Sequence, residues 1–218
     1  MFLGHFAVAF AAKRAAPTAS LGTWVVACQL LDLLWPLFVL LGIETVAIAP
    51  GITVFSPLDF TYYPWTHSLV MAALWACALG VLYWRLRRNY VVATLIGLVV
   101  LSHWFLDLLV HRPDLPLAPG SGVKVGFGLW NSVAGTLIVE FVLFALGVGL
   151  YLGGNRARDR QGRYGFWALV IFLVIAYVSA SFGPPPPGVS AMAWVTLLGG
   201  VIVAGWTYWL DRHREMKA

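Results

Sequence analysis

Long apolar runs separated by short polar segments dominate this chain, and their lengths predict a membrane protein. Each run has about 18–23 residues, the length that an α-helix needs to cross a hydrocarbon core of about 30 Å. The six runs cover roughly residues 21–42, 66–85, 90–110, 130–152, 165–182 and 189–210. Residues 2–12 are apolar but too short to cross, so we expect a half-inserted helix packed against protein. The pattern predicts an all-α, polytopic transmembrane helical bundle that forms a single domain over residues 1–218.

Composition supports the membrane assignment and excludes other classes. Hydrophobic residues make up 61% of the chain and charged residues 11%, whereas soluble domains have about 25% charged residues. The net charge of +5 does not indicate nucleic acid, because the basic residues form short clusters between the apolar runs. Cys28 and Cys77 both lie inside apolar runs, so they predict neither a disulfide framework nor a CxxC metal pair.

Lysine and arginine gather in alternate loops, which predicts the topology. They lie before the first run, between the second and third, between the fourth and fifth, and after the sixth. The other three loops together hold only Arg112 and Lys124. Because basic residues favour the cytoplasmic side, we expect a multi-pass protein of the inner (plasma) membrane with both termini in the cytoplasm.

Ionisable residues within the apolar runs, or at their edges, are the functional candidates, because a membrane interior disfavours charge. They are His5, Asp32, His67, His103, Asp107, His111 and Glu140. All of them are imidazole or carboxylate groups, which are common ligands of divalent metal ions.

The strongest local motif is Ser102-His103-Trp104-Phe105-Leu106-Asp107, which continues to His111. His103, Asp107 and His111 are spaced by four residues and therefore share one stripe of a helix. His103 and Asp107 are close enough to grip one cation, whereas His103 and His111 are about 12 Å apart along the helix axis. Either two ions bind, or His111 belongs to substrate binding or to the support of a ligand.

Two weaker motifs surround Asp32 and His67. Thr66 is an expected N-cap where a loop turns into a helix just before His67. Pro36, four residues after Asp32, is expected to kink the first span and open room beside the carboxylate.

Structural readings of the same residues remain open. His103 and Asp107 are also compatible with a hydrogen-bonded pair that joins helices, and Asp32 with a proton-transfer or packing carboxylate. His5 and His67 are equally compatible with structural histidines. For Glu140 we expect a structural role, as an acid paired with an asparagine or a histidine inside the bundle. His111 and Asp114 lie at the outer boundary, where a surface loop and a site are equally compatible with the sequence.

Several short motifs, in order, resemble a known family. They are Gly4-His5, Asp32 with Pro36 after it, Thr66-His67-Ser68-Leu69, and Leu101-Ser102-His103 followed by Asp107. Over roughly residues 1–120, and not over the C-terminal helices at 130–210, they resemble the bacterial inner-membrane metal-dependent hydrolases, the LexA-regulated membrane-bound hydrolase group.

This resemblance implies a metal site and also a departure from the family pattern. It implies Asp32, His67, His103 and Asp107 as metal ligands, with His5 as a further candidate. Members of that group typically carry an acid and a histidine just before the proline, where this chain has Leu34 and Trp35. Fewer ligands imply weaker metal binding, or one ion in place of two.

Together these features favour a membrane-embedded metal-dependent hydrolase that uses a divalent ion, Zn²⁺ or Mn²⁺. His111 and Asp114 are the candidate catalytic residues, as general acid and base or as substrate contacts. The depth of the site favours a lipid or a lipid-linked ester or phosphoester from the outer leaflet. The alternatives are a small proton- or ion-coupled transporter that uses Asp32 and Glu140, and a non-catalytic membrane scaffold.

Overall fold

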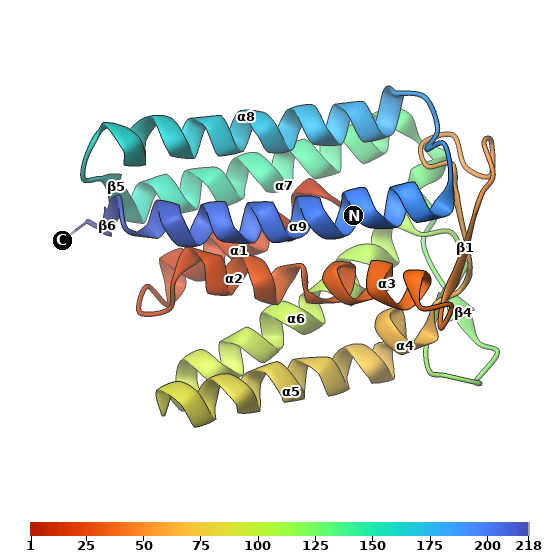
Figure 1. Ribbon diagram of the computed structural model, residues 1–218, viewed down its shortest axis with the longest axis horizontal. Helices are drawn as coiled ribbons and strands as arrows, with labels where there is room; N and C mark the ends of the chain where they lie inside the picture. The colour runs from red at the N-terminus through yellow and green to blue at the C-terminus, as the bar shows by residue number, and fades with distance from the viewer. Residues whose placement is uncertain (218) are drawn as a thin grey trace.

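The computed structural model describes residues 1–217 and is a bundle of apolar helices (Figure 1). Five helices are long and apolar enough to cross a membrane: α5 (Leu69–Arg87), α6 (Tyr90–Val110), α7 (Val133–Gly154), α8 (Arg160–Phe182) and α9 (Val189–Asp211). Helices α2 (Leu21–Cys28) and α3 (Leu30–Leu40) are bent by 54° at the break between them and are apolar enough as a pair to make a sixth, broken span or a re-entrant loop. The predicted all-α polytopic bundle is therefore confirmed.

Helix α1 (Leu3–Ala15) lies inside this bundle and packs mainly on α7 and α2. Its 13 residues extend about 20 Å, which is short of a membrane crossing. At its C-terminal end, the Lys13 ammonium lies 2.8 Å from the Asp211 carboxylate at the end of α9. Its N-terminal end reaches into the protein interior, where Leu3, Gly4 and His5 are buried.

The break in the first span lies at Gln29 and not at Pro36, which sits within α3. A continuous helix would direct the Cys28 carbonyl to the N–H of Asp32, four residues on. Instead, this carbonyl accepts a hydrogen bond from Nδ1 of His103 at 2.7 Å. The expected kink at Pro36 was thus misplaced, because a tertiary hydrogen bond sets the position of the break.

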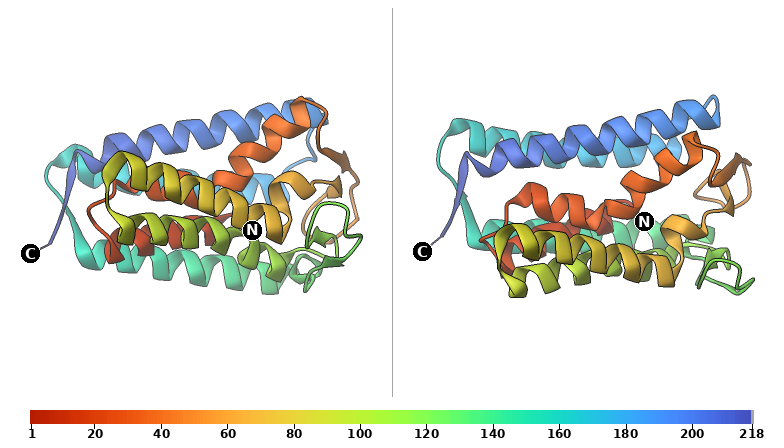
Figure 2. Two further views of the ribbon diagram at one scale, coloured as in Figure 1. Left: turned by 90° about the horizontal axis from the view of Figure 1, so that it is seen from below. Right: turned by 60° about the horizontal axis from the view of Figure 1, so that its bottom comes forward.

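Short hairpins close the two ends of the bundle. One end carries the pairs β1 (Thr45–Ile48) with β2 (Leu58–Tyr62) and β3 (Leu115–Pro116) with β4 (Lys124–Val125), together with α4 (Pro64–His67) and the 3₁₀ turn η1 (Leu129–Asn131). The other end carries β5 (Asn155–Ala157) paired with β6 (Arg214–Met216). The views in Figures 1 and 2 agree that these two sets of loops lie at opposite ends.

The N-cap expected at Thr66 was wrong, because a short helix, α4, precedes the spanning helix α5. Thr66 lies within α4, and Ser68 is the residue that caps α5 by accepting a hydrogen bond from the N–H of Met71. The chain therefore breaks at Ser68, directly after His67, and α5 begins at Leu69.

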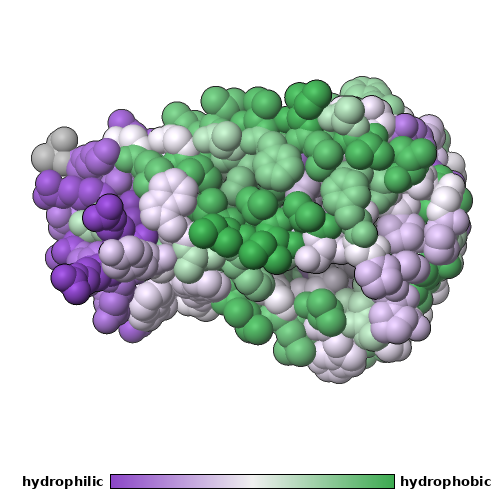
Figure 3. All heavy atoms as spheres, turned by 90° about the horizontal axis from the view of Figure 1, so that it is seen from above, coloured by the Kyte–Doolittle hydropathy of each residue, from purple (hydrophilic) through white to green (hydrophobic). Residues whose placement is uncertain are grey.

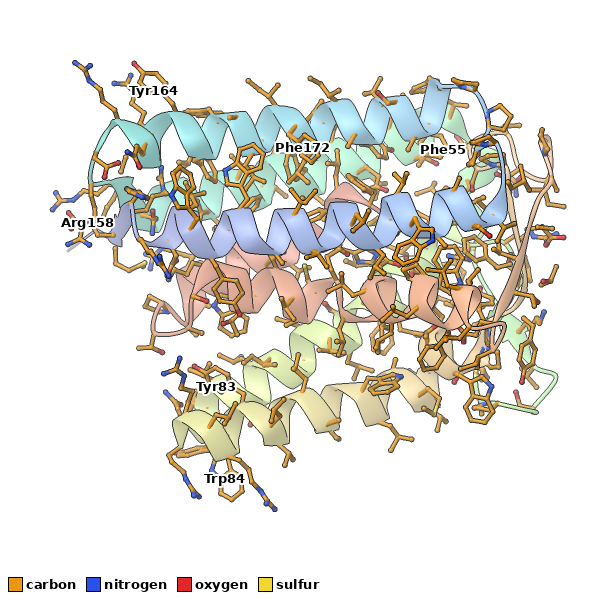
Figure 4. All side chains as sticks on the ribbon, in the orientation of Figure 1. Phe55, Tyr83, Trp84, Arg158, Tyr164 and Phe172 are labelled. Carbon is orange, nitrogen blue, oxygen red and sulfur yellow. The ribbon has the colours of Figure 1, made fainter. Side chains whose placement is uncertain are left out.

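The surface separates into a hydrophobic band and polar ends (Figure 3). Large apolar side chains such as Leu74, Ile171 and Val195 point outward from the spans. Figure 4 places Arg158, Tyr164 and Trp84 at the same end of the molecule, where β5 and β6 also lie. This distribution is that of an integral membrane protein, with lipid facing the band.

Candidate metal centre

Five of the sequence-predicted residues come together in the interior, from four separate helices. They are His5 of α1, Asp32 of α3, His67 of α4, and His103 and Asp107 of α6. They form two overlapping groups, His5–His103–Asp107 and Asp32–His67–His103, and the donor atoms of each group lie within 4.8 Å of one another. The two groups share His103, so the cluster is one continuous set of imidazoles and carboxylates.

The spacing of the donor atoms suits a metal ion. Nε2 of His103 lies 3.1 Å from Asp107 Oδ2 and 3.6 Å from Asp32 Oδ1. Nε2 of His67 lies 3.4 Å from Asp32 Oδ1 and 3.9 Å from Asp107 Oδ2. A tetrahedral ion with ligands at about 2.0–2.2 Å sets its donor atoms about 3.3–3.6 Å apart. The observed separations bracket that range.

His5 approaches the other face of the same carboxylate. Its Nε2 lies 3.2 Å from Asp107 Oδ1, and its ring stacks on the ring of His103 with centroids 3.6 Å apart. The amino group of Met1 forms an ion pair with the same oxygen of Asp107. Asp107 therefore faces His5 with one oxygen and faces His67 and His103 with the other, as a carboxylate that bridges the two groups.

Hydrogen bonds at Nδ1 fix the imidazoles of His103 and His67, so the Nε2 atom of each faces the cluster. Nδ1 of His103 donates to the Cys28 carbonyl, which can only accept. Nε2 of His103 is buried and has no hydrogen-bond partner among residues 1–217, although a carboxylate oxygen is 3.1 Å away. A lone pair placed this close to a carboxylate is repelled unless a cation or a proton lies between them. This orphaned nitrogen fits a metal ligand whose other nitrogen is held in place.

Glu44 orients His67 through the Thr66 hydroxyl and was missed by the sequence analysis. The hydroxyl donates to Glu44 Oε2 at 2.7 Å, so it accepts from Nδ1 of His67, also at 2.7 Å. Glu44 Oε1 accepts from the backbone N–H groups of Trp65 and Thr66, at the start of α4. Burial raises the pKa of Glu44. The available signal was a lone acid directly after the first span, which we had assigned to the outer loop.

Glu140 holds the first turn of α1, which corrects the pairing expected for it. Its two carboxylate oxygens accept from the backbone N–H groups of Phe2 and Gly4, each at 2.8 Å, rather than from an asparagine or a histidine. The first turn of α1 has no side-chain cap of its own, and the free N–H groups of a helix start favour an anion. Glu140 thereby fixes the backbone at Phe2 and Gly4. Because His5 directly follows Gly4, its position is fixed as well.

The centre is largely dry, and Asp32 is its exposed member. The side chains of His5, His67, His103 and Asp107 are at most 5% exposed, whereas that of Asp32 is 32% exposed. Asp32 is therefore the one member of the cluster that is open to its surroundings, while the other four groups are shielded.

His111 and Asp114 form a second cluster and are not part of the metal-type groups found in residues 1–217. Nδ1 of His111 lies 2.9 Å from Asp114 Oδ1, and the Tyr63 hydroxyl lies 3.3 Å from both atoms. The rings of Trp130 and Phe60 pack on His111, with centroids 4.3 and 5.0 Å away. Burial lowers the pKa of His111 and raises that of Tyr63.

Tyr63 joins the two clusters. Its ring lies 5.4 Å from that of His67 and 6.0 Å from that of His111, between centroids. The backbone N–H of His111 bonds the carbonyl of Asp107, one helical turn earlier. The histidine–aspartate pair therefore borders the five-residue centre without entering it.

Comparison with known proteins places the chain in a family. A search of curated proteins and a search of solved structures found no match. A family model does match residues 1–184, a stretch that contains every residue of both clusters and ends before α9. On that match, and in agreement with its apolar helices, the chain belongs to the family of YdjM inner membrane proteins and is a multi-pass inner membrane protein.

Proposed function

We propose that this protein is a metal-dependent hydrolase whose divalent ion is held by His67, His103, Asp32 and Asp107, with His5 on the second oxygen of Asp107. The observation that carries the proposal is the orphaned Nε2 of buried His103, aimed at two carboxylates while Nδ1 is held by a backbone carbonyl. Buried carboxylates in a membrane protein require compensating positive charge. The Met1 ammonium supplies part of it at Asp107, and a divalent cation would supply the rest where the donors converge.

Zn²⁺ and Mn²⁺ suit the mixed imidazole and carboxylate donors best. Such an ion supplies Lewis acidity, which activates water and polarises an ester or phosphoester oxygen. The protein's own groups fix the donors: Cys28 orients His103, the Glu44–Thr66 pair orients His67, and Glu140 places His5. Ligands oriented in this way hold an ion in one geometry, and their supporting partners commonly affect metal affinity by about 10–100-fold.

For His111 and Asp114 we propose general acid–base catalysis or substrate contact. Asp114 accepts from Nδ1 of His111 and leaves Nε2 as the atom that exchanges a proton. Because burial lowers the pKa of His111, the imidazole is neutral at pH 7 and can act as a base. The pair also contacts Tyr63 and Trp130 beside the centre.

The proposed substrate is a lipid or lipid-linked ester, preferably a phosphoester, that enters from the outer leaflet. The loops rich in arginine and the C-terminus lie at the β5–β6 end, which by the positive-inside tendency is cytoplasmic, whereas the Met1 amino group lies inside the bundle at Asp107. The centre lies toward the other end of the bundle, beside α4 and the last turns of α6. An amphiphile can bring its ester to that depth while its tails stay in lipid.

Two other functions receive less support. A proton-coupled carrier would use Asp32 and Glu140 as coupling acids, but both oxygens of Glu140 are engaged by the backbone of α1. A non-catalytic scaffold would use the cluster to join helices through ion pairs, such as protonated His103 with Asp107 Oδ2 at 3.1 Å, and the protein would then be purified without metal.

Metal content tests the proposal directly. We expect detergent-purified protein to retain about one or two divalent ions per chain in elemental analysis, and His103→Ala and Asp107→Asn to lose them while remaining folded. Asp159→Asn is the matched control, because Asp159 is an acid outside the membrane that pairs with His213; it should retain the metal. Wild-type protein that contains no metal and takes up neither Zn²⁺ nor Mn²⁺ would refute the metal centre.

Hydrolysis is tested separately with a phosphodiester chromogen and with phospholipid vesicles. Activity should require the added ion and disappear in Asp107→Asn, while Asp159→Asn keeps it. Metal binding without hydrolysis of either probe would retain the metal centre and reject this substrate class.

A further inference from the structure

A lipid-facing groove between α5 and α6 lies apart from the metal centre. It is open to the surface, has a volume of about 450 Å³ and is lined mostly by apolar groups such as Ala73, Cys77, Trp84 and Leu98, together with Thr94. Its floor is backbone, because Gly80 and Gly97 let the two helices touch. A Cβ at Gly80 would lie 3.0 Å from the Ala93 carbonyl oxygen, and one at Gly97 would lie 3.3 Å from that of Ala76.

The end of this groove near the α5–α6 turn is strongly basic. Arg85, Arg87 and Arg88 are exposed there, in the last turn of α5 and directly after it. Within residues 1–217, ion pairs are formed by the side chains of three other arginines, Arg112, Arg156 and Arg158. The three arginines at the end of the groove therefore have no carboxylate partner among the described residues. Three adjacent cations at a membrane surface attract anionic lipid head groups.

Arg88 connects the basic end to the apolar groove. Its guanidinium lies 5.7 Å from the centroid of the Trp84 ring, which lines the groove. Arg88 is also the one residue other than glycine with positive φ, 54°, among residues 1–217. Glycine or asparagine is favoured in that left-handed position at a helix end. Figure 4 shows Trp84 at the same end of the molecule as Arg158.

We infer that this groove binds an anionic phospholipid of the leaflet at the arginine-rich end, with an acyl chain along α5 and α6 and the phosphate at Arg87 and Arg88. Trp84 and Tyr90 stand at the mouth, where amphipathic aromatic rings favour the head-group level. The lipid phosphate neutralises the unpaired arginines, and its chain covers the apolar walls. This site is independent of the proposed hydrolase centre.

A second copy of the chain fits the groove less well. A two-fold axis along the membrane normal would bring the same surface of both copies together. The three arginines of one copy would then face the three of the other at the same end of the membrane, and like charges oppose that contact. An anionic lipid would instead be attracted by these arginines.

Lipid binding by the purified full-length chain tests the inference. Native mass spectrometry would compare phosphatidylglycerol with phosphatidylcholine of identical acyl chains. We expect wild-type protein to bind one phosphatidylglycerol about 10-fold or more tightly than phosphatidylcholine, and Arg87→Gln/Arg88→Gln to remove most of that preference, since each basic residue near the surface contributes to anionic lipid binding. Both arginines are exposed, so the variant should fold normally.

The matched control is Arg160→Gln/Arg163→Gln, which removes the same charge from exposed positions of α8, away from the groove. It should bind phosphatidylglycerol within about twofold of wild type. Thr94→Trp fills the groove without a change of charge and should weaken phosphatidylglycerol binding as much as the arginine pair does.

Three results would overturn the inference. Equal binding of phosphatidylglycerol and phosphatidylcholine by wild type would show that the lipid's charge is not recognised. Equal losses of phosphatidylglycerol binding in the two arginine variants would show that the site does not lie at Arg87 and Arg88. Oxidative cross-linking between copies through exposed Cys77, with the other cysteine Cys28 buried, would assign the groove to a dimer interface instead.

Discussion

Glu140 provides the sharpest test of how the centre is held together, because it lies outside the ligand set and accepts hydrogen bonds from the backbone N–H groups at the start of α1. Replacing it by glutamine keeps the size of the side chain and removes its charge. The amide oxygen can still accept a hydrogen bond from one of the two N–H groups, of Phe2 or of Gly4. The amide NH₂ is a donor and faces the other N–H, so that hydrogen bond is lost. We therefore expect α1 to loosen at its first turn without loss of the bundle.

The size of the effect follows from these two bonds. A hydrogen bond to a charged group contributes about 1.5–3 kcal/mol, and a buried N–H left without a partner costs about 1–3 kcal/mol. Glu140→Gln loses one such bond and weakens the other, so we expect a loss of about 2–4 kcal/mol. For a chain of this length that corresponds to a decrease in Tm of roughly 4–16 °C. Because His5 is one residue beyond Gly4, metal affinity should fall by about 10–100-fold as well.

The assay combines thermal unfolding in detergent with a titration of Zn²⁺ against a competing chelator. The matched control is Glu215→Gln, the same substitution in an exposed acid that pairs with Arg156 and Arg158; surface pairs contribute about 0–1 kcal/mol. A Glu140→Gln variant that melts lower yet binds Zn²⁺ as tightly as wild type would show that α1 is stabilised by Glu140 but does not position a ligand. An unchanged melting temperature would refute the claim that Glu140 stabilises the first turn of α1.

Two further predictions concern the surroundings of the centre. Thr66→Val removes the hydroxyl between Glu44 and His67 and should weaken metal binding by about 10–100-fold in the chelator titration; unchanged affinity would reject the relay. His111 has a lowered pKa, so the unfolded chain binds its proton more readily and stability should decrease as the pH falls from about 6.5 through the folded pKa. In chelator-treated samples melted from pH 8 to 5, His111→Gln should lose less stability than wild type, and parallel curves would contradict this assignment.

The residue types of the centre were predictable from sequence because the membrane makes them rare. His103 and Asp107 share a helical stripe, and their partners His5, Asp32 and His67 stood out as isolated polar residues in apolar surroundings. Their convergence depends on packing between distant segments, which no local pattern contains. The structure brings them together, and the nature of what they bind stays a proposal.

The supporting residues were harder to predict, because their partners are backbone groups. Glu44 and Glu140 bind N–H groups at the starts of α4 and α1, and those groups become available only once the helices have formed. Likewise, the break at Gln29 depends on His103, 74 positions later in the chain, which takes the Cys28 carbonyl. Pro36 was the visible helix breaker in sequence, yet α3 accommodates it.

The location of the centre follows from the discontinuities of the helices. His5 lies in the first turn of α1, Asp32 just after the break at Gln29, and His67 at the end of α4. Each discontinuity exposes backbone N–H or carbonyl groups, which a membrane interior tolerates only where protein or a polar cavity satisfies them. Here Glu140, Glu44 and a histidine satisfy them, so the same breaks that would destabilise a continuous span supply the hydrogen bonds that orient the imidazoles. Unbroken helices of the same composition would carry the same ligands with nothing to fix their direction.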